Sequence, residues 1–269
     1  MTPTPALRVR PAAVAGAFYP AGRDDLLEAL RRAFEGAVVS GAEAPVPKAL
    51  VVPHAGYPYS GPIAASAYLR LVPGRASIRR VVLVGPSHRA PVRGVAVSGA
   101  DAFATPLGLV PVDLVARDVV LAMPGVHVDD AAHAFEHSLE VQLPFLQVVL
   151  DGFELLPLAV NDWAAADVAA VLETVWGGPE TLIVASTDLS HYHPYVDAVQ
   201  LDTVTAAAIV AAVPEAIGDR DACGAAGLRG LLAAACAHRL GVAQVDLRNS
   251  GDTAGDRQRV VGYGAFVVA

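Results

Sequence analysis

Cysteine and basic residues are scarce in this sequence, and each shortage argues against a class of protein. Only Cys223 and Cys236 occur in 269 residues, so we expect no disulfide framework and a reducing, cytoplasmic location. Lysine and arginine number 19 against 27 acidic residues, which gives a net charge of −8. This balance argues against nucleic acid or an anionic membrane surface as the main partner. A small molecule, a peptide or a protein is therefore the expected partner.

Long hydrophobic runs are also missing. Hydrophobic residues make up 54% of the chain, but they occur in short segments, and none reaches the roughly 18 uncharged residues of a membrane span. Residues 1–11 lack the apolar core of a secretory signal. Because no long linker or block of charge divides the chain, we expect residues 1–269 to form one domain.

Three short apolar runs each lead to a histidine. The runs 49–52, 81–84 and 181–186 are followed by His54, His88 and His191. Their composition is typical of strands that are buried on both faces of a parallel sheet. The carboxyl ends of such strands form the crevice where ligands bind, so three imidazoles could meet there. A metal ion is the simplest ligand for them.

The remaining periodicity predicts an α/β fold: a single layered domain with a central, largely parallel sheet flanked by helices. Residues 54–62 read as a loop, and residues 129–149 begin irregularly and become helical near His137, with Pro144 breaking the helix. The other expected elements are helices at 23–34, 63–71, 113–123, 164–176, 196–213 and 223–240 and strands at 94–98, 153–160, 242–247 and 260–268.

Asp188 lies three residues before His191 and adds a carboxylate to the same strand end. It could orient a histidine or transfer a proton. The nearby Ser186 and Ser190 raise the alternative of a Ser-His-Asp hydrolase, but the chain has no Gly-x-Ser-x-Gly segment. Tyr57 and Tyr59, in the loop after His54, are candidates to shape the substrate opening.

Residues 133–137 match the zinc-binding pattern H-x-x-E-H, which requires a continuous helix. We favour a different interpretation, in which Glu136, His137 and Glu140 line the same pocket as the other histidines. His133 is then expected to point elsewhere, toward solvent.

The two cysteines lie in different sequence environments. Cys223 precedes an apolar helical segment, and a thiol at a helix N-terminus has a lowered pKa and binds metals well. Cys236 is surrounded by alanines and is expected to be a core residue.

Seven segments of the chain form a characteristic set: 14–20, 53–57, 85–88, 136–140, 186–191, 222–224 and 250–252. Taken together they resemble the Memo-like family, whose prokaryotic members are called AmmeMemoRadiSam system protein B. The segments occur in the family order and cover nearly the whole chain. The resemblance implies a fold similar to that of the class III extradiol ring-cleaving dioxygenases, which are non-haem iron enzymes.

The resemblance also implies site roles. His54, His88 and Cys223 correspond to the metal ligands, and Asp188, His191 and His137 to residues that line the pocket. The dioxygenases use a glutamate where this chain has Cys223, and a thiolate favours zinc, copper(I) or a thiolate-ligated iron. Iron is the first expectation, with copper or zinc as alternatives.

Two functions follow from the resemblance. The first is a metal-dependent, dioxygenase-like redox activity on an unidentified small molecule or partner, with radical SAM and AMMECR-like proteins as system partners. The alternative is a non-enzymatic module that uses the same pocket to bind a peptide or protein. Whether the chain is an enzyme stays open at this stage.

Overall fold

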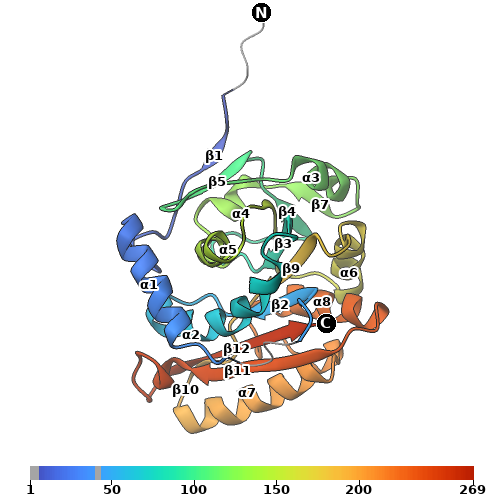
Figure 1. The fold of residues 1–269 in the computed structure, drawn as a ribbon. Coiled ribbons are helices and arrows are strands. Elements are labelled where there is room, and N and C mark those ends of the chain that lie inside the picture. Colours follow the sequence, from blue (N-terminus) through green and yellow to red (C-terminus); the bar gives the residue numbers. More distant parts are fainter. Residues whose placement is uncertain (1–5, 40–43) are drawn as a thin grey trace, which may run out of the picture.

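A large mixed sheet forms the centre of the protein (Figure 1). The structure is a computed structural model and describes residues 6–39 and 44–269; part of the expectation about a secretory signal falls on residues 1–5, outside this range. The strands across the sheet are β10 (His191–His193), β12 (Val260–Val268), β2 (Ala49–Val52), β9 (Thr181–Ser186), β3 (Arg80–Gly85), β8 (Glu154–Val160), β4 (Val95–Val97) and β7 (Val126–Val128), and β11 (Val242–Asn249) pairs with β12.

The direction of the strands changes from the centre of the sheet to its outer parts. Strands β2, β9, β3 and β8 are parallel, as the sequence predicts. Strand β4 is antiparallel to β8, and β12 is antiparallel to β2, β10 and β11. A short loop joins β11 to β12, and a connection of this kind can only place neighbouring strands antiparallel. The predicted α/β fold is confirmed, with a parallel centre and antiparallel pairs outside it.

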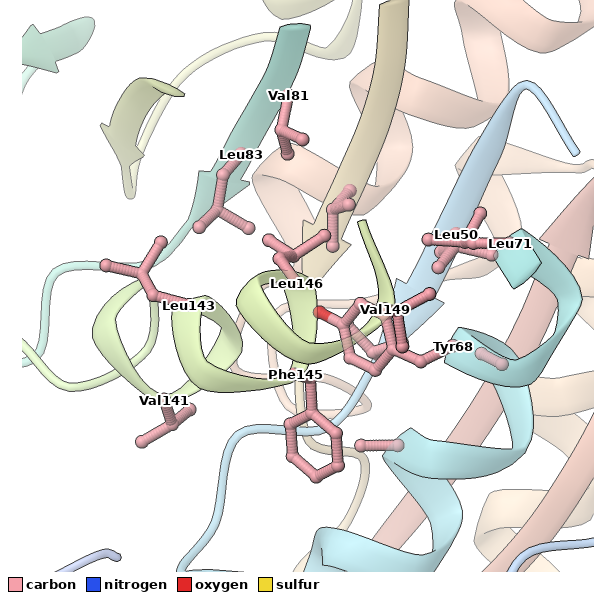
Figure 2. Packing of buried hydrophobic residues seen from close by; sticks show 14 of the residues in the cluster. Leu50, Tyr68, Leu71, Val81, Leu83, Val141, Leu143, Phe145, Leu146 and Val149 are labelled. Carbon is pink, nitrogen blue, oxygen red and sulfur yellow. The ribbon is translucent and has the colours of Figure 1, made fainter. Parts of the chain in front are cut away.

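The central strands are buried on both faces, and their side chains alternate between two cores. In β2, Leu50 and Val52 face one core while Ala49 and Val51 face the other. Figure 2 shows part of the first core, where Leu50 and side chains of β3 lie near the helix that begins at Leu143. Helices α1 (Arg23–Glu35), α2 (Tyr57–Tyr68) and α5 (Leu143–Val149) cover this face, and α3 (Leu114–Leu121), α6 (Ala165–Thr174), α7 (Tyr195–Val210) and α8 (Ala225–Ala237) cover the other.

Two prolines were misread from the sequence. Residues 57–62 belong to α2 instead of a loop, because Pro58 occupies the first turn, where a helix needs no N–H donor. Pro144 likewise lies at the start of α5 and does not break a helix. The segment before α5 consists of α4 (Asp130–Ala134) and a 3-10 turn, η2 (Glu140–Gln142).

A small second sheet was not predicted. It consists of β1 (Val9–Arg10), β5 (Ala102–Thr105) and β6 (Gly108–Pro111). Within the described residues, no helix has the length and apolar character needed to cross a membrane. Of the predicted site residues, His54, His88 and Asp188 lie just past the ends of β2, β3 and β9, on one edge of the parallel centre.

Candidate metal centre

Three of the predicted side chains meet at this edge of the sheet. His54, His88 and Cys223 each offer one ligand atom, and these atoms lie within 4.8 Å of one another. The Nε2 atom of His54 is 3.2 Å from Sγ of Cys223, and the rings of His54 and His88 meet edge to face with centroids 5.2 Å apart. His54 follows β2, His88 follows β3, and Cys223 precedes α8, so three separate elements contribute to one cluster.

Backbone contacts hold Cys223 against the end of β9. The Cys223 N–H donates to the Asp188 carbonyl at 3.2 Å, and the Asp188 N–H donates to Sγ at 3.3 Å. The next residue, Gly224, donates its N–H to Oγ1 of Thr187. A Cβ atom at Gly224 would lie 2.6 Å from the Ser186 carbonyl oxygen, so only glycine permits α8 to begin this close to β9.

The expectations for the two cysteines need correction. Burial, together with the nearby Asp188 carboxyl, raises the pKa of Cys223 to about 12, whereas the helix-start argument predicted a lowered pKa. Cys223 precedes the first turn of α8, and the cost of desolvating a thiolate outweighs any effect of the helix dipole. A bound cation would reverse this preference. Cys236 was expected in the core but is exposed, with Sγ 3.3 Å from the Ala212 carbonyl oxygen.

Glu136 orients His88. One carboxylate oxygen lies 2.9 Å from Nδ1 of His88 and also accepts the N–H groups of His137 and Ser138, while the other accepts the His88 N–H. Burial alone would raise the pKa of Glu136, but the hydrogen bonds from His88 and Ser138 lower it to about 2. The sequence indicated only that Glu136 lines the pocket. With its lone pairs directed at four donors, Glu136 supports His88 from behind and is poorly suited to bind metal.

His137 lies against the rings of His54 and His88. Its ring stacks on His88 with centroids 4.6 Å apart and lies 4.4 Å from the ring of Phe18. Burial lowers the pKa of His137 to about 4. Among the described residues, its buried Nδ1 finds no hydrogen-bond partner. The nearest carboxylate oxygen, Oε1 of Glu136, is 3.2 Å from Nδ1. A neutral imidazole therefore lies beside the cluster.

The structure also places Asp188 and His191 at the end of β9. Oδ1 of Asp188 accepts the His54 N–H at 2.7 Å. Burial raises the pKa of Asp188 to about 7, against the opposing effect of the hydrogen bond from His54. Nδ1 of His191 donates to the Leu189 carbonyl at 2.7 Å, which leaves Nε2 as the nitrogen available to a ligand. Burial lowers the pKa of His191.

Two residues predicted to bind substrate have other roles. Tyr57 is buried, and its hydroxyl donates to the Val141 carbonyl at 2.8 Å, so it belongs to the core. Glu140 is fully buried, and its carboxylate pairs with the Arg10 guanidinium and accepts further hydrogen bonds from the segment around Val14. A carboxylate saturated in this way has no lone pair left for a ligand. Tyr59 is 42% exposed and remains available at the surface.

The H-x-x-E-H interpretation is not supported. Helix α4 ends at Ala134, so no continuous helix carries both His133 and His137. His133 is 1% exposed, which makes the expectation of a solvent-facing side chain wrong, and its Nε2 lies 3.0 Å from the Ala96 carbonyl oxygen. The hydrolase alternative is not supported either, because Ser186 and Ser190 are both buried, at 1% and 3% exposed, and neither is an accessible nucleophile.

The donor set suits a transition metal ion. Two imidazole nitrogens and one sulfur form a mixed set that zinc, copper(I) and iron accept. The hydrogen bond that Nδ1 of His88 donates to Glu136 is consistent with a prepared site, because it leaves Nε2 of His88 as the nitrogen available to an ion.

Comparison with known proteins shows which family the chain resembles. A family model described as "Memo-like protein" matches residues 10–267. A "MEMO1 family protein" of Aquifex aeolicus (strain VF5) is 38% identical, with 96% of this chain and 98% of the relative covered. Similar relatives occur in Thermotoga sp. (strain RQ2), 37% identical with 94% of this chain and 97% of the relative covered, and in Aeropyrum pernix, 35% identical with 97% and 100% covered.

A solved structure shows the same fold. The crystal structure of uncharacterized protein JW3007 from Escherichia coli K12 matches with a TM-score of 0.50 and 17% identity, covering 81% of this chain and 98% of the other. At this level of identity the likeness concerns the fold alone.

Proposed function

The chain belongs to the Memo-like protein family, and we propose that it binds one metal ion through His54, His88 and Cys223. The observation that carries this proposal is the convergence of three donor atoms within 4.8 Å from three separate elements. Nitrogen and sulfur ligands favour iron, copper(I) or zinc over magnesium or calcium. Among these, iron is the ion that we propose first, with copper and zinc as alternatives.

Two side chains beside the proposed ion have groups that can take part in acid–base chemistry. When bound, the ion would supply Lewis-acid or redox chemistry. The carboxyl group of Asp188 and Nε2 of His191 are the groups that we propose to hold or release a proton beside it. His137 limits the pocket on a third side through its contact with His88. Tyr59 is the exposed residue that could contact a substrate at the rim.

The proposed activity is a metal-dependent, dioxygenase-like oxidation of an unidentified small molecule or of a partner protein. It is supported by the donor set of two histidines and one further ligand, because three protein ligands would leave room for a substrate or oxygen at the ion. Radical SAM and AMMECR-like proteins are the proposed system partners, and the cytoplasm is the proposed compartment.

One observation favours a second function. The third donor is the thiol of Cys223, whereas the dioxygenases that the sequence resembles use a carboxylate. A changed ligand is compatible with a pocket that binds a peptide or protein without turnover. Oxygen consumption by metal-loaded protein, measured with the products of the partner proteins present, distinguishes the two functions.

The metal site itself is tested by removing two ligands. We expect the double variant His54→Ala with His88→Ala to lose stoichiometric binding of iron(II) and zinc, because a single cysteine cannot hold either ion. Elemental analysis after reconstitution and desalting measures the binding. His127→Ala, which removes an exposed imidazole on β7, is the matched control and should bind as the wild type does. Equal metal content in the double variant and the wild type would exclude this site.

A further inference from the structure

His54 stands at the end of a buried chain of hydrogen bonds that begins on α2. The chain runs from Tyr68 through Gln142 and Ser186 to Nδ1 of His54, and these four residues are at most 2% exposed. Figure 2 shows Tyr68 reaching from α2 toward the helix that follows Gln142. No water is needed to complete this chain, so donors and acceptors within it determine one another.

The orientation of Gln142 follows from Pro53. The Pro53 carbonyl lies 2.9 Å from Nε2 of Gln142, and a carbonyl can only accept, so the amide NH₂ must face it. The second N–H of the amide then donates to Oγ of Ser186 at 2.9 Å. Oε1 is left facing the Tyr68 hydroxyl at 2.8 Å, and Tyr68 is therefore the donor.

The hydrogen bonds of Ser186 determine which ring nitrogen of His54 carries the hydrogen. A hydroxyl has one hydrogen, and Oγ of Ser186 lies 2.6 Å from the Ser138 carbonyl oxygen, which can only accept it. Oγ must then accept from both remaining neighbours, Gln142 and Nδ1 of His54, the latter at 2.9 Å. Its two lone pairs are thereby used, and Nδ1 of His54 has to carry the hydrogen.

The other ring nitrogen consequently has a free lone pair. Nε2 of His54 faces Sγ of Cys223 at 3.2 Å, which places the lone pair inside the donor cluster. A histidine binds metal only through an unprotonated nitrogen, and a partner on the opposite nitrogen selects the tautomer.

We propose that Gln142 and Ser186 are positioning residues that fix His54 in the Nδ1–H tautomer and so present Nε2 to the metal. The consequence for metal binding rests on the proposed function, whereas the tautomer is a property of the metal-free protein. In His88 the partner of Nδ1 is the carboxylate of Glu136. The partners of Nδ1 in His54 are neutral groups, so no carboxylate has to be desolvated behind this ring.

Long-range ¹H–¹⁵N NMR of the histidine side chains tests the proposal. The sample is chelator-treated protein labelled with ¹⁵N-histidine, and the His54 signals are assigned by their absence in His54→Ala. We expect the wild type to show the Nδ1–H tautomer. In Ser186→Ala the acceptor is gone, so the ring should shift to Nε2–H and donate to Cys223, and zinc affinity should fall about 10- to 100-fold.

A control variant and the wild-type spectrum keep the test decisive. Ser66→Ala removes another buried hydroxyl, one that bonds to Asp246, and should change neither tautomer nor zinc affinity. If Ser186→Ala does not fold, the spectrum of the wild type alone still decides which ring nitrogen of His54 carries the hydrogen.

An Nε2–H tautomer in the wild type would overturn the proposal, as would a Ser186→Ala protein with wild-type tautomer and affinity. Wild-type protein with the Nδ1–H tautomer but no zinc binding would support the chain of hydrogen bonds and contradict the proposed function instead.

Discussion

Two side chains at the proposed site could carry the negative charge that a divalent cation needs. Glu136 remains ionised because hydrogen bonds from His88 and Ser138 hold its pKa at about 2 despite its burial. Cys223 would have to lose its proton to bind a metal. A thiolate from Cys223 and the carboxylate behind His88 would then offset the positive charge of the ion without a carboxylate ligand.

His133 provides a test of the buried polar groups outside the cluster. Burial lowers its pKa to about 4, whereas an unfolded histidine has a pKa near 6.5. Below about pH 6.5 the unfolded chain therefore binds a proton that the folded protein does not bind. The free energy of unfolding falls as the pH drops through this range. Between pH 7 and pH 5 this residue alone should reduce the free energy of unfolding by about 2 kcal/mol.

His133→Gln isolates this contribution. The glutamine amide can retain the hydrogen bond to the Ala96 carbonyl but cannot take up a proton. Urea denaturation at several pH values should show a flatter profile for the variant than for the wild type, by about 2 kcal/mol between pH 7 and pH 5. His127→Gln, at an exposed position, should follow the wild type. Parallel profiles of His133→Gln and the wild type would show that His133 is not neutral and buried.

At the scale of single residues, the sequence predicted the positions of side chains that come directly after a strand. His54 and His88 follow directly from where β2 and β3 end. Glu140 was assigned to the pocket wrongly because its partner, Arg10, lies 130 positions away. The burial of His133 depends in the same way on Ala96, which is distant in the chain. Local sequence carries no signal for such contacts.

At the scale of elements, the start of α8 against β9 determines where Cys223 lies. We expect Gly224→Ala to lower the free energy of unfolding by about 1–3 kcal/mol, because the added Cβ overlaps the Ser186 carbonyl. Zinc affinity should fall as well, since the helix start has to move away and takes the thiol with it. Denaturation and zinc titration measure the two effects.

Gly152→Ala is the matched control for this substitution. A Cβ at Gly152 meets no atom within 4 Å, so stability and zinc affinity should stay close to the wild type. A Gly224→Ala protein that behaves like the Gly152→Ala protein would contradict the tight docking of α8.

The elements that were not predicted lack the sequence patterns that usually mark a hairpin or the start of a helix. The β5–β6 hairpin turns at Pro106 and Leu107, which are not the Asn-Gly or Asp-Gly pairs that mark two-residue hairpins. The first turn of α2 contains Pro58, and sequence cannot easily distinguish a proline that begins a helix from one in a loop. Longer elements with a clear period, such as α1 and β9, were predicted almost to the residue.

At the scale of the whole molecule, the site depends on the order of strands in the sheet. Strand β9 lies between β2 and β3, although it follows both in the sequence by about a hundred residues. This insertion places Asp188 and Cys223 between the two histidines. The sequence predicted a crevice at the strand ends but not the order of the strands, because that order depends on packing across both faces of the sheet.

X-ray absorption at the zinc edge of stoichiometrically loaded protein tests the central claim most directly. The account predicts one sulfur and at least two imidazole nitrogens around the ion, from Cys223, His54 and His88. In Cys223→Ser the sulfur contribution should disappear while the imidazole contribution remains. A wild-type spectrum with nitrogen and oxygen neighbours but no sulfur would contradict the proposed metal centre.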